Sequence, residues 1–171
     1  YEEVKLPKLE EGQKRAYISN LIDDIAKKYG DKVSYYSTSG ANANVEFKRQ
    51  NLGELLGGCD IVSIHAPLNE KTRNLIGERE LNLMKEGALL MNFGRGGIVD
   101  ENAVARAIDE RNLRFAADVL ETEPMSADHP LLNIKNKENL ILTPHVAWAS
   151  FEARERLVAM IAENIKEFLK G

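Results

Sequence analysis

The sequence has very little cysteine, no excess of basic residues and no long apolar run, and each absence argues against a class of protein. Its single cysteine, Cys59, cannot form an internal disulfide, which argues against a disulfide-stapled secreted fold. A formal net charge of -4, without a lysine-rich block, gives no reason to expect binding to nucleic acid. No apolar stretch reaches the length of a membrane span, and no apolar segment opens the sequence. We therefore expect a cytoplasmic protein whose partners are small molecules or other proteins, without nucleic acid or membrane.

Length and composition suit one globular domain, or one domain with an appendage. A chain of 171 residues with 43% hydrophobic residues is long enough to bury a sizeable core. Residues 1–14 are charged and show no sustained apolar period, so we interpret them as an arm or linker. Residues 15–149 alternate short apolar runs with segments of helical spacing, whereas residues 150–171 keep helical spacing throughout. This pattern predicts an α/β domain over residues 15–149 and an amphipathic helix after it.

The alternation of strands with helices predicts a doubly wound parallel sheet with helices on both sides. Predicted strands cover residues 15–18, 32–37, 59–65, 88–91, 114–118 and 140–142. The first predicted helix is capped by Ser19 or Asn20 and ended by Gly30. Others cover residues 52–56 and 78–85, and two more begin at the capping residues Asp100 and Ser150. The polar composition of residues 38–44 predicts a loop. Cys59 is interpreted as a core thiol at the start of its strand.

The stretch Asn-Phe-Gly-Arg-Gly-Gly-Ile-Val-Asp, residues 92–100, is the most informative in the chain. It follows the apolar run 88–91, so Arg95 is expected among glycines at the tip of a buried strand. Ligands of open α/β sheets bind outside the carboxyl ends of the strands, and arginine offers a planar fork of donors for a carboxylate. Arg95 is therefore interpreted as an anion clamp. A tight turn with a solvated arginine is the alternative.

Three predicted strands are each followed by one residue that could belong to a proton-transfer site. These residues are Arg95, Glu123 before Pro124, and His145 after Pro144. Histidine can gain and lose a proton near neutral pH, and a carboxylate on its far nitrogen would fix its tautomer. Taken singly, His145 could be a structural residue and Glu123 a solvated loop acid. No spacing in the chain indicates a metal site.

These motifs, in this order, resemble the D-isomer-specific 2-hydroxyacid dehydrogenases from about Lys32 to Leu169. The matching segments are residues 59–68, Thr72, residues 75–76, 92–100, 118–124 and 143–147. The resemblance implies an oxidoreductase with a Rossmann-like fold that transfers a hydride between a nicotinamide and a 2-keto or 2-hydroxy acid. It also implies that Arg95 binds the substrate's carboxylate and carbonyl, that His145 is the acid/base, and that Glu123 holds His145. A homodimer is implied for the intact protein.

The resemblance also assigns the residues that would bind NAD or NADP. They are Ser37, Thr38, His65, Ala66, Pro67, Thr72, Phe93, Gly94 and Asp118. Residues 65–67 would lie near the adenosine, and Asp118 near the nicotinamide amide. Ser37 and Thr38 stand where the family usually has an acid that bonds the ribose, and hydroxyls fit a ribose phosphate as well as a free ribose. A plain polar turn explains these two residues equally well.

The sequence departs from the family in two ways. Residues 17–24 hold no glycine where a G-x-G-x-x-G turn would cradle the pyrophosphate, and Asp23 and Asp24 would repel it. The fold is therefore expected to be incomplete at its first strand-turn-helix, and NADH binding is expected to be weak. In addition, residues 1–14 cannot supply a substrate domain. The alternatives are part of a longer enzyme, or a non-catalytic truncated or deleted remnant that acts as an interaction module.

Overall fold

The computed structural model describes residues 32–38, 47–146 and 149–170. These residues fall into two compact units, Tyr1–Leu55 and Leu56–Gly171. The strand predicted at residues 15–18 and the helix predicted between its cap at Ser19 or Asn20 and Gly30 lie outside the described ranges.

The described part of the first unit contains a small parallel sheet in which β1 (Ser34–Tyr35) pairs with β2 (Lys48–Arg49). The strand predicted at residues 32–37 is confirmed in its centre, whereas β2 was not predicted because its two charged residues carry no apolar pattern. After it, α2 (Leu52–Gly58) begins at a reciprocal cap. Glu54 N–H donates to Asn51 Oδ1 at 2.9 Å, and Asn51 N–H donates to Glu54 Oε2 at 3.3 Å. This cap explains the predicted helix start.

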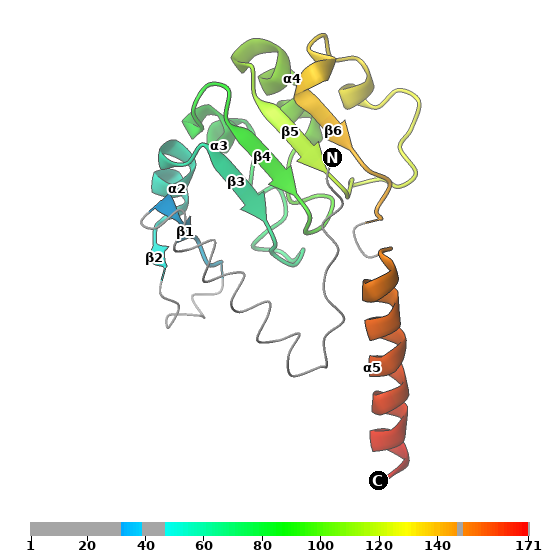
Figure 1. Cartoon of the computed structure of the whole chain (residues 1–171). Helices are drawn as coiled ribbons and strands as arrows, with labels where there is room; N and C mark the ends of the chain where they lie inside the picture. The colour runs from blue at the N-terminus through cyan, green and yellow to red at the C-terminus, as the bar shows by residue number, and fades with distance from the viewer. Residues whose placement is uncertain (1–31, 39–46, 147–148, 171) are drawn as a thin grey trace, which may run out of the picture. The chain divides into compact units, whose positions relative to one another are not determined.

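The second unit is built on a four-stranded parallel sheet in the order β3-β4-β5-β6 (Figure 1). Its strands are β3 (Ile61–Ile64), β4 (Leu89–Asn92), β5 (Arg114–Ala117) and β6 (Leu140–Leu142). The helices α3 (Glu78–Leu83) and α4 (Glu101–Arg111) connect β3 to β4 and β4 to β5, and they pack against each other. Both crossovers step the same way across the sheet, and such crossovers are right-handed, so both helices cover one face. The predicted α/β fold with a parallel sheet is confirmed, and helices on the second face of the sheet stay a prediction.

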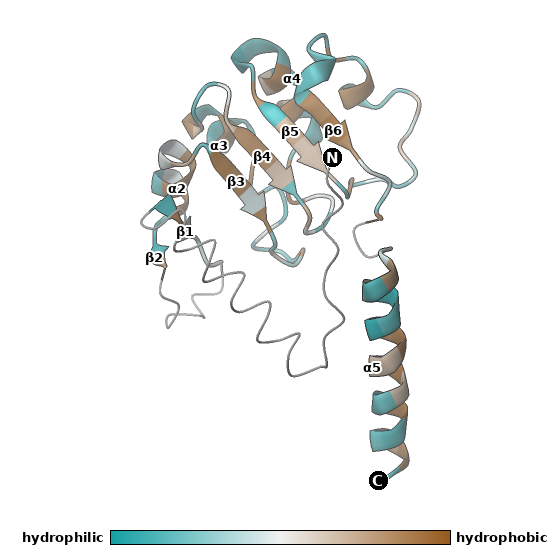
Figure 2. Cartoon of the chain, in the orientation of Figure 1, coloured by the Kyte–Doolittle hydropathy of each residue, from teal (hydrophilic) through white to brown (hydrophobic). Residues whose placement is uncertain are grey.

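The two central strands carry the core of the second unit. Leu90 of β4 pairs with Phe115 of β5, and the two residues are 0% and 1% exposed. Figure 2 shows the apolar character of these strands. Further buried apolar residues come from the neighbouring strands, helices and loops: Val62, Ile64, Ile76, Leu81, Met84, Ile98, Val99, Val104, Ile108 and Leu131. A well-packed core of this kind holds the strand ends in fixed positions.

The helix α4 begins and ends as the sequence predicts. The Asp100 side chain accepts hydrogen bonds from the N–H groups of Asn102 and Ala103, at 2.9 and 3.0 Å. These bonds satisfy two of the amides that a helix start leaves without partners. At the other end Asn112 takes the left-handed conformation, with φ of 54°, and terminates the helix.

The long helix α5 (Phe151–Leu169) follows its predicted cap, Ser150, which accepts from Ala153 N–H at 3.2 Å. Figure 2 shows its amphipathic character, with an apolar face and a polar face. None of its residues is buried, so the predicted apolar face is exposed in this chain. The face consists of Leu157, Met160, Ile161, Ile165, Phe168 and Leu169. None of the helices in the described ranges is long and apolar enough to cross a membrane.

Two expectations for the start of β3 are wrong. The strand begins at Ile61 rather than at Cys59, and Cys59 has intermediate exposure instead of lying in the core. The neighbouring Asp60 explains the difference, because its carboxylate forms an exposed ion pair with Lys85 at 2.8 Å. A charged partner at this point keeps the entry to the strand at the surface.

Candidate active site

The residues that follow β4 form a turn closed by a buried amide. Asn92, the last residue of the strand, is 2% exposed. Its Nδ2 donates to the Arg95 carbonyl at 3.0 Å, and its Oδ1 accepts from Gly94 N–H at 3.1 Å. The Arg95 side chain is exposed, and its Nη1 donates to the Gly94 carbonyl at 2.8 Å. The predicted position of Arg95 at a strand tip is therefore found in the structure, with its backbone fixed by Asn92.

This turn is held between the loops that follow the two neighbouring strands. A Cβ on Gly94 would lie 2.8 Å from the carbonyl oxygen of Ala66, which follows β3. A Cβ on Gly96 would overlap with the carbonyl of Leu120, which follows β5. Since backbone lies on both sides, only glycine allows the Arg95 turn to sit so close to both loops.

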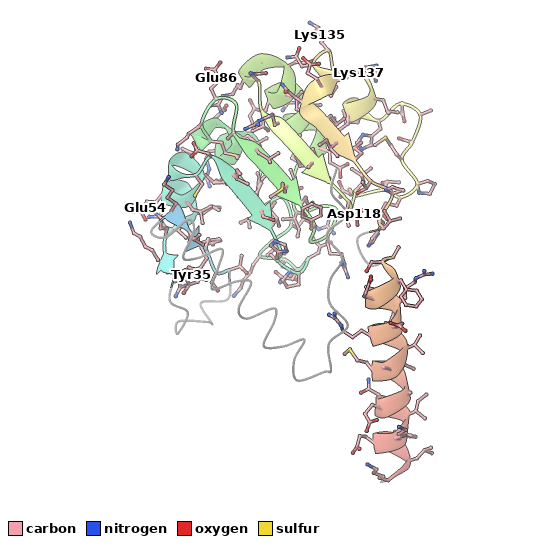
Figure 3. All side chains as sticks on the ribbon, in the orientation of Figure 1. Tyr35, Glu54, Glu86, Asp118, Lys135 and Lys137 are labelled. Carbon is pink, nitrogen blue, oxygen red and sulfur yellow. The ribbon has the colours of Figure 1, made fainter. Side chains whose placement is uncertain are left out.

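Asp118 connects the end of β5 to the segment that carries His145. Figure 3 shows Asp118 at the edge of the sheet toward which the strand arrows point, with Lys135 and Lys137 at the opposite edge. Its buried carboxylate accepts from Thr143 Oγ1 at 2.5 Å and from Val146 N–H at 2.9 Å. Between these two contacts His145 has a φ of 54°, in the left-handed region. Asp118 thus stabilises a turn that would otherwise be unfavourable.

The predicted carboxylate–imidazole pair is present. Glu123 Oε2 lies 2.8 Å from His145 Nδ1, and Glu123 Oε1 accepts from Leu120 N–H at 2.8 Å. The Leu120 N–H bond and then the bond to His145 lower the pKa of Glu123, against a smaller opposing effect of burial. Because the carboxylate can only accept, Nδ1 carries the proton in this pair. The histidine tautomer is therefore set by Glu123.

Arg95, Glu123 and His145 lie around one pocket of about 290 Å³. Its other lining residues are Leu68, Gly96, Val119, Leu120 and Glu121. The structure thus brings together the three residues proposed from the sequence. Leu68 and Glu121 were not assigned, although both lie within the matched segments. Glu121 also forms an exposed ion pair with Arg73 at 3.2 Å. In the described ranges no group of His, Cys, Asp and Glu could hold a metal ion.

The residues assigned to a cofactor occupy several places. His65 and the exposed Phe93 stack at a centroid distance of 6.5 Å with an interplanar angle of 27°, just beyond β3 and β4. Thr72 is fully buried, and its hydroxyl donates to the Pro67 carbonyl at 2.7 Å, so it shapes the loop that carries residues 65–67. Ser37 and Thr38 follow β1 in the first unit. For all the residues assigned to a cofactor, direct contact with it stays a prediction.

The lowered pKa of Glu123 predicts a pH-dependent contribution to stability. A carboxyl whose folded pKa is depressed stabilises the fold above its unfolded pKa, about 4.3, and loses that contribution as pH falls through the folded pKa. Glu123→Gln should therefore destabilise the chain at neutral pH by no more than about 1 kcal/mol, since the pair is partly exposed. The difference from wild type should shrink below about pH 4.3.

Urea unfolding at neutral pH and at a pH below about 4.3 measures this effect. Glu86→Gln is the matched control. Glu86 is an exposed glutamate at the opposite edge of the sheet (Figure 3), so its replacement should leave stability nearly unchanged. A Glu123→Gln difference that is the same at both pH values would contradict the assignment.

Comparison with known proteins identifies the family. The family model described as "D-isomer specific 2-hydroxyacid dehydrogenase, NAD binding domain" matches residues 17–147. A glyoxylate reductase of Aeropyrum pernix is 42% identical over 158 residues, which cover 90% of this chain and 46% of that protein. The chain thus spans about half the length of this curated relative.

Two solved structures have the same fold. A D-lactate dehydrogenase of Aquifex aeolicus, complexed with NAD and lactic acid, matches with a TM-score of 0.74 and 29% identity, over 90% of this chain and 51% of that one. An acyclic imino acid reductase in complex with NADPH and D-Arg matches with a TM-score of 0.75 and 32% identity, over 90% of this chain and 48% of that one. The chain therefore belongs to the D-isomer specific 2-hydroxyacid dehydrogenase family and carries its NAD-binding domain.

Proposed function

We propose that this domain provides the proton-transfer and cofactor-binding half of an enzyme that reduces small 2-keto acids with NADH or NADPH. The observation that supports the proposal most directly is the 2.8 Å contact between Glu123 and His145 in the pocket that Arg95 also lines. Because the chain spans about half of its relatives, we further propose that a substrate domain completes the pocket in the working enzyme. A homodimer in the cytoplasm is part of the same proposal.

The described residues fit a nicotinamide cofactor at the carboxyl edge of the sheet. The stacked rings of His65 and Phe93 offer an aromatic surface there, and Phe93 is 43% exposed. Gly94 lies so close to the carbonyl of Ala66 that no Cβ fits between them. The backbone of Gly94 is therefore free of a side chain at this point. Asp118 supplies a buried carboxylate at the end of β5. Residues 17–24, where the glycine turn would lie, are outside the described ranges, so weak binding of NADH by this chain stays a prediction.

Each of the three pocket residues has a separate role in the proposed reaction. A nicotinamide bound here would supply the hydride that reduces the keto carbon, and the residues of this chain do the rest. Arg95 pairs with the substrate carboxylate and orients the carbonyl. His145 donates its proton from Nε2 to the substrate oxygen, and Glu123 holds Nδ1 and stabilises the protonated ring. The reverse reaction uses the same residues, with His145 as base.

Replacing Arg95 tests the proposed substrate binding. In a polypeptide that joins this domain to a substrate domain, Arg95→Lys should raise the KM for glyoxylate or another 2-keto acid about tenfold or more, because lysine keeps the charge but loses the bidentate fork. The KM for NADH should change little. The measurement is the rate at which NADH absorbance is lost.

Arg106→Lys is the matched control, since Arg106 forms an exposed ion pair with Glu78 on the surface of α4. It should leave both Michaelis constants unchanged. If the wild-type protein binds NADH but oxidises it with none of the 2-keto acids, the proposal fails and the non-catalytic interaction module becomes the better interpretation.

A further inference from the structure

A second carboxylate–imidazole pair lies outside the pocket of Arg95 and His145. Glu101, the first residue of α4, has a side chain that is 10% exposed, and its partner His129 is 7% exposed. Glu101 Oε2 lies 2.8 Å from His129 Nε2, and Glu101 Oε1 accepts from Glu121 N–H at 2.8 Å. Both Glu101 and His129 line a different, polar pocket of about 380 Å³. The proposed catalytic role of Arg95, Glu123 and His145 does not use them.

The hydrogen bonds of His129 fix its tautomer. His129 Nδ1 accepts from Leu131 N–H at 3.3 Å, at the start of the short 3-10 helix η2 (Pro130–Leu132). A backbone N–H can only donate, so Nδ1 carries no proton and Nε2 donates to Glu101. The tautomer is therefore opposite to that of His145, whose Nδ1 donates to Glu123.

Glu101 holds the loop after β5 at two points. One carboxylate oxygen binds the backbone at Glu121, and the other binds the side chain of His129. Glu123 lies between these two points in the sequence. The side chains from Glu121 to Asp128 are exposed or partly exposed, so few core contacts order this loop. A buried carboxylate with two partners supplies the fixed position that packing does not.

We propose that Glu101, with His129, is a positioning residue that places Glu123 against His145. This inference rests on the proposed function for its catalytic consequence, but its structural part can be measured in the chain itself. Losing the Glu101 carboxylate removes the buried contacts at Glu121 N–H and at His129 and leaves Glu121 its exposed ion pair with Arg73, a weak constraint, so Glu123 moves away from Nδ1 of His145. A glutamine cannot replace it, because one amide cannot accept from both Glu121 N–H and His129 Nε2–H through separate oxygens.

Long-range ¹H–¹⁵N NMR of the histidine rings, at a pH where they are neutral, tests the inference. In the wild-type chain His145 should be protonated at Nδ1 and His129 at Nε2. Glu101→Gln should change both rings, with His145 losing its Nδ1 preference and approaching the mixture of a free imidazole. Glu123→Gln is the positive control and should change His145 alone.

Asp109→Asn is the matched control. Asp109 is also a carboxylate of α4 that binds backbone, accepting from Lys135 N–H at 2.9 Å and Asn136 N–H at 3.0 Å. These contacts lie beyond His129, so this variant should lose stability without changing the tautomer of His145. A Glu101→Gln protein in which His129 changes and His145 does not would overturn the proposal.

Two further measurements complete the test. If Glu101→Gln fails to fold, amide order parameters of the wild-type chain decide, because Glu121 and His129 should be as rigid as β5, at about 0.85. Mobility at both residues equal to that of Ser126 would overturn the inference. In a polypeptide with a substrate domain, Glu101→Gln should lower kcat by up to about 10²-fold and leave the KM for NADH unchanged. Tautomers that behave as expected in a protein without activity would refute the proposed function but not the positioning.

Discussion

Replacing His145 with glutamine should lower the kcat for 2-keto acid reduction by about 10²–10⁴-fold, the usual contribution of a general acid or base. Glutamine is similar in size and keeps a hydrogen-bonding group near Glu123, but it has no proton to transfer at neutral pH. The imidazole acts on the substrate oxygen as charge develops, so the affinity for NADH should not change. Steady-state kinetics in a polypeptide with a substrate domain, together with NADH titration, measure both effects.

Lys137→Gln provides the comparison, because Lys137 is exposed at the opposite edge of the sheet (Figure 3). It should leave kcat and NADH affinity unchanged. A His145→Gln enzyme that kept most of its turnover would show that the acid/base assignment is wrong, and that the family resemblance describes the fold but not the chemistry of this pocket.

Replacing Gly96 with alanine should destabilise the chain by about 1–3 kcal/mol or more, as overpacking does. The added Cβ overlaps with the carbonyl of Leu120, and backbone cannot rotate away as a long side chain can. The Arg95 turn and the loop after β5 must therefore separate. Since Arg95 and Glu123 lie on these two segments, the pocket should widen and activity should fall together with stability. Urea unfolding of the variant chain measures the stability loss.

The same substitution at Gly58 is the control for Gly96→Ala. A Cβ on Gly58 meets no atom of another segment within 4 Å, so Gly58→Ala should raise the free energy of unfolding by about 0.4–1 kcal/mol, because alanine restricts the unfolded chain. Equal stability of the two variants would mean that the turn and the loop are not in the close contact described. A Gly96→Ala protein that is destabilised but fully active would show that this close contact stabilises the chain without setting the geometry of the pocket.

Local patterns in the sequence determined most of the second unit. β6 has its predicted bounds, β4 and β5 are displaced or shortened by a single residue, and α4 and α5 begin at the predicted caps Asp100 and Ser150. These features depend on apolar spacing and on caps, which involve residues within one or two turns of each other. The position of Arg95 at a strand tip follows from the same local signals. β2 was missed because two charged residues give no such signal.

Only the tertiary structure decided which strand ends meet and what holds them. The contact of Glu123 with His145 follows from the placement of β5 beside β6, and the sequence alone left both residues open to structural roles. The overlap of Gly96 with Leu120 and the bonds of Glu101 to Glu121 and His129 join segments that are distant in the sequence. Such contacts depend on how loops pack against one another across neighbouring strands, and no residue period encodes that arrangement. The sequence thus determined the elements and the candidate residues, whereas packing of the strand-end loops decided the geometry of the pocket.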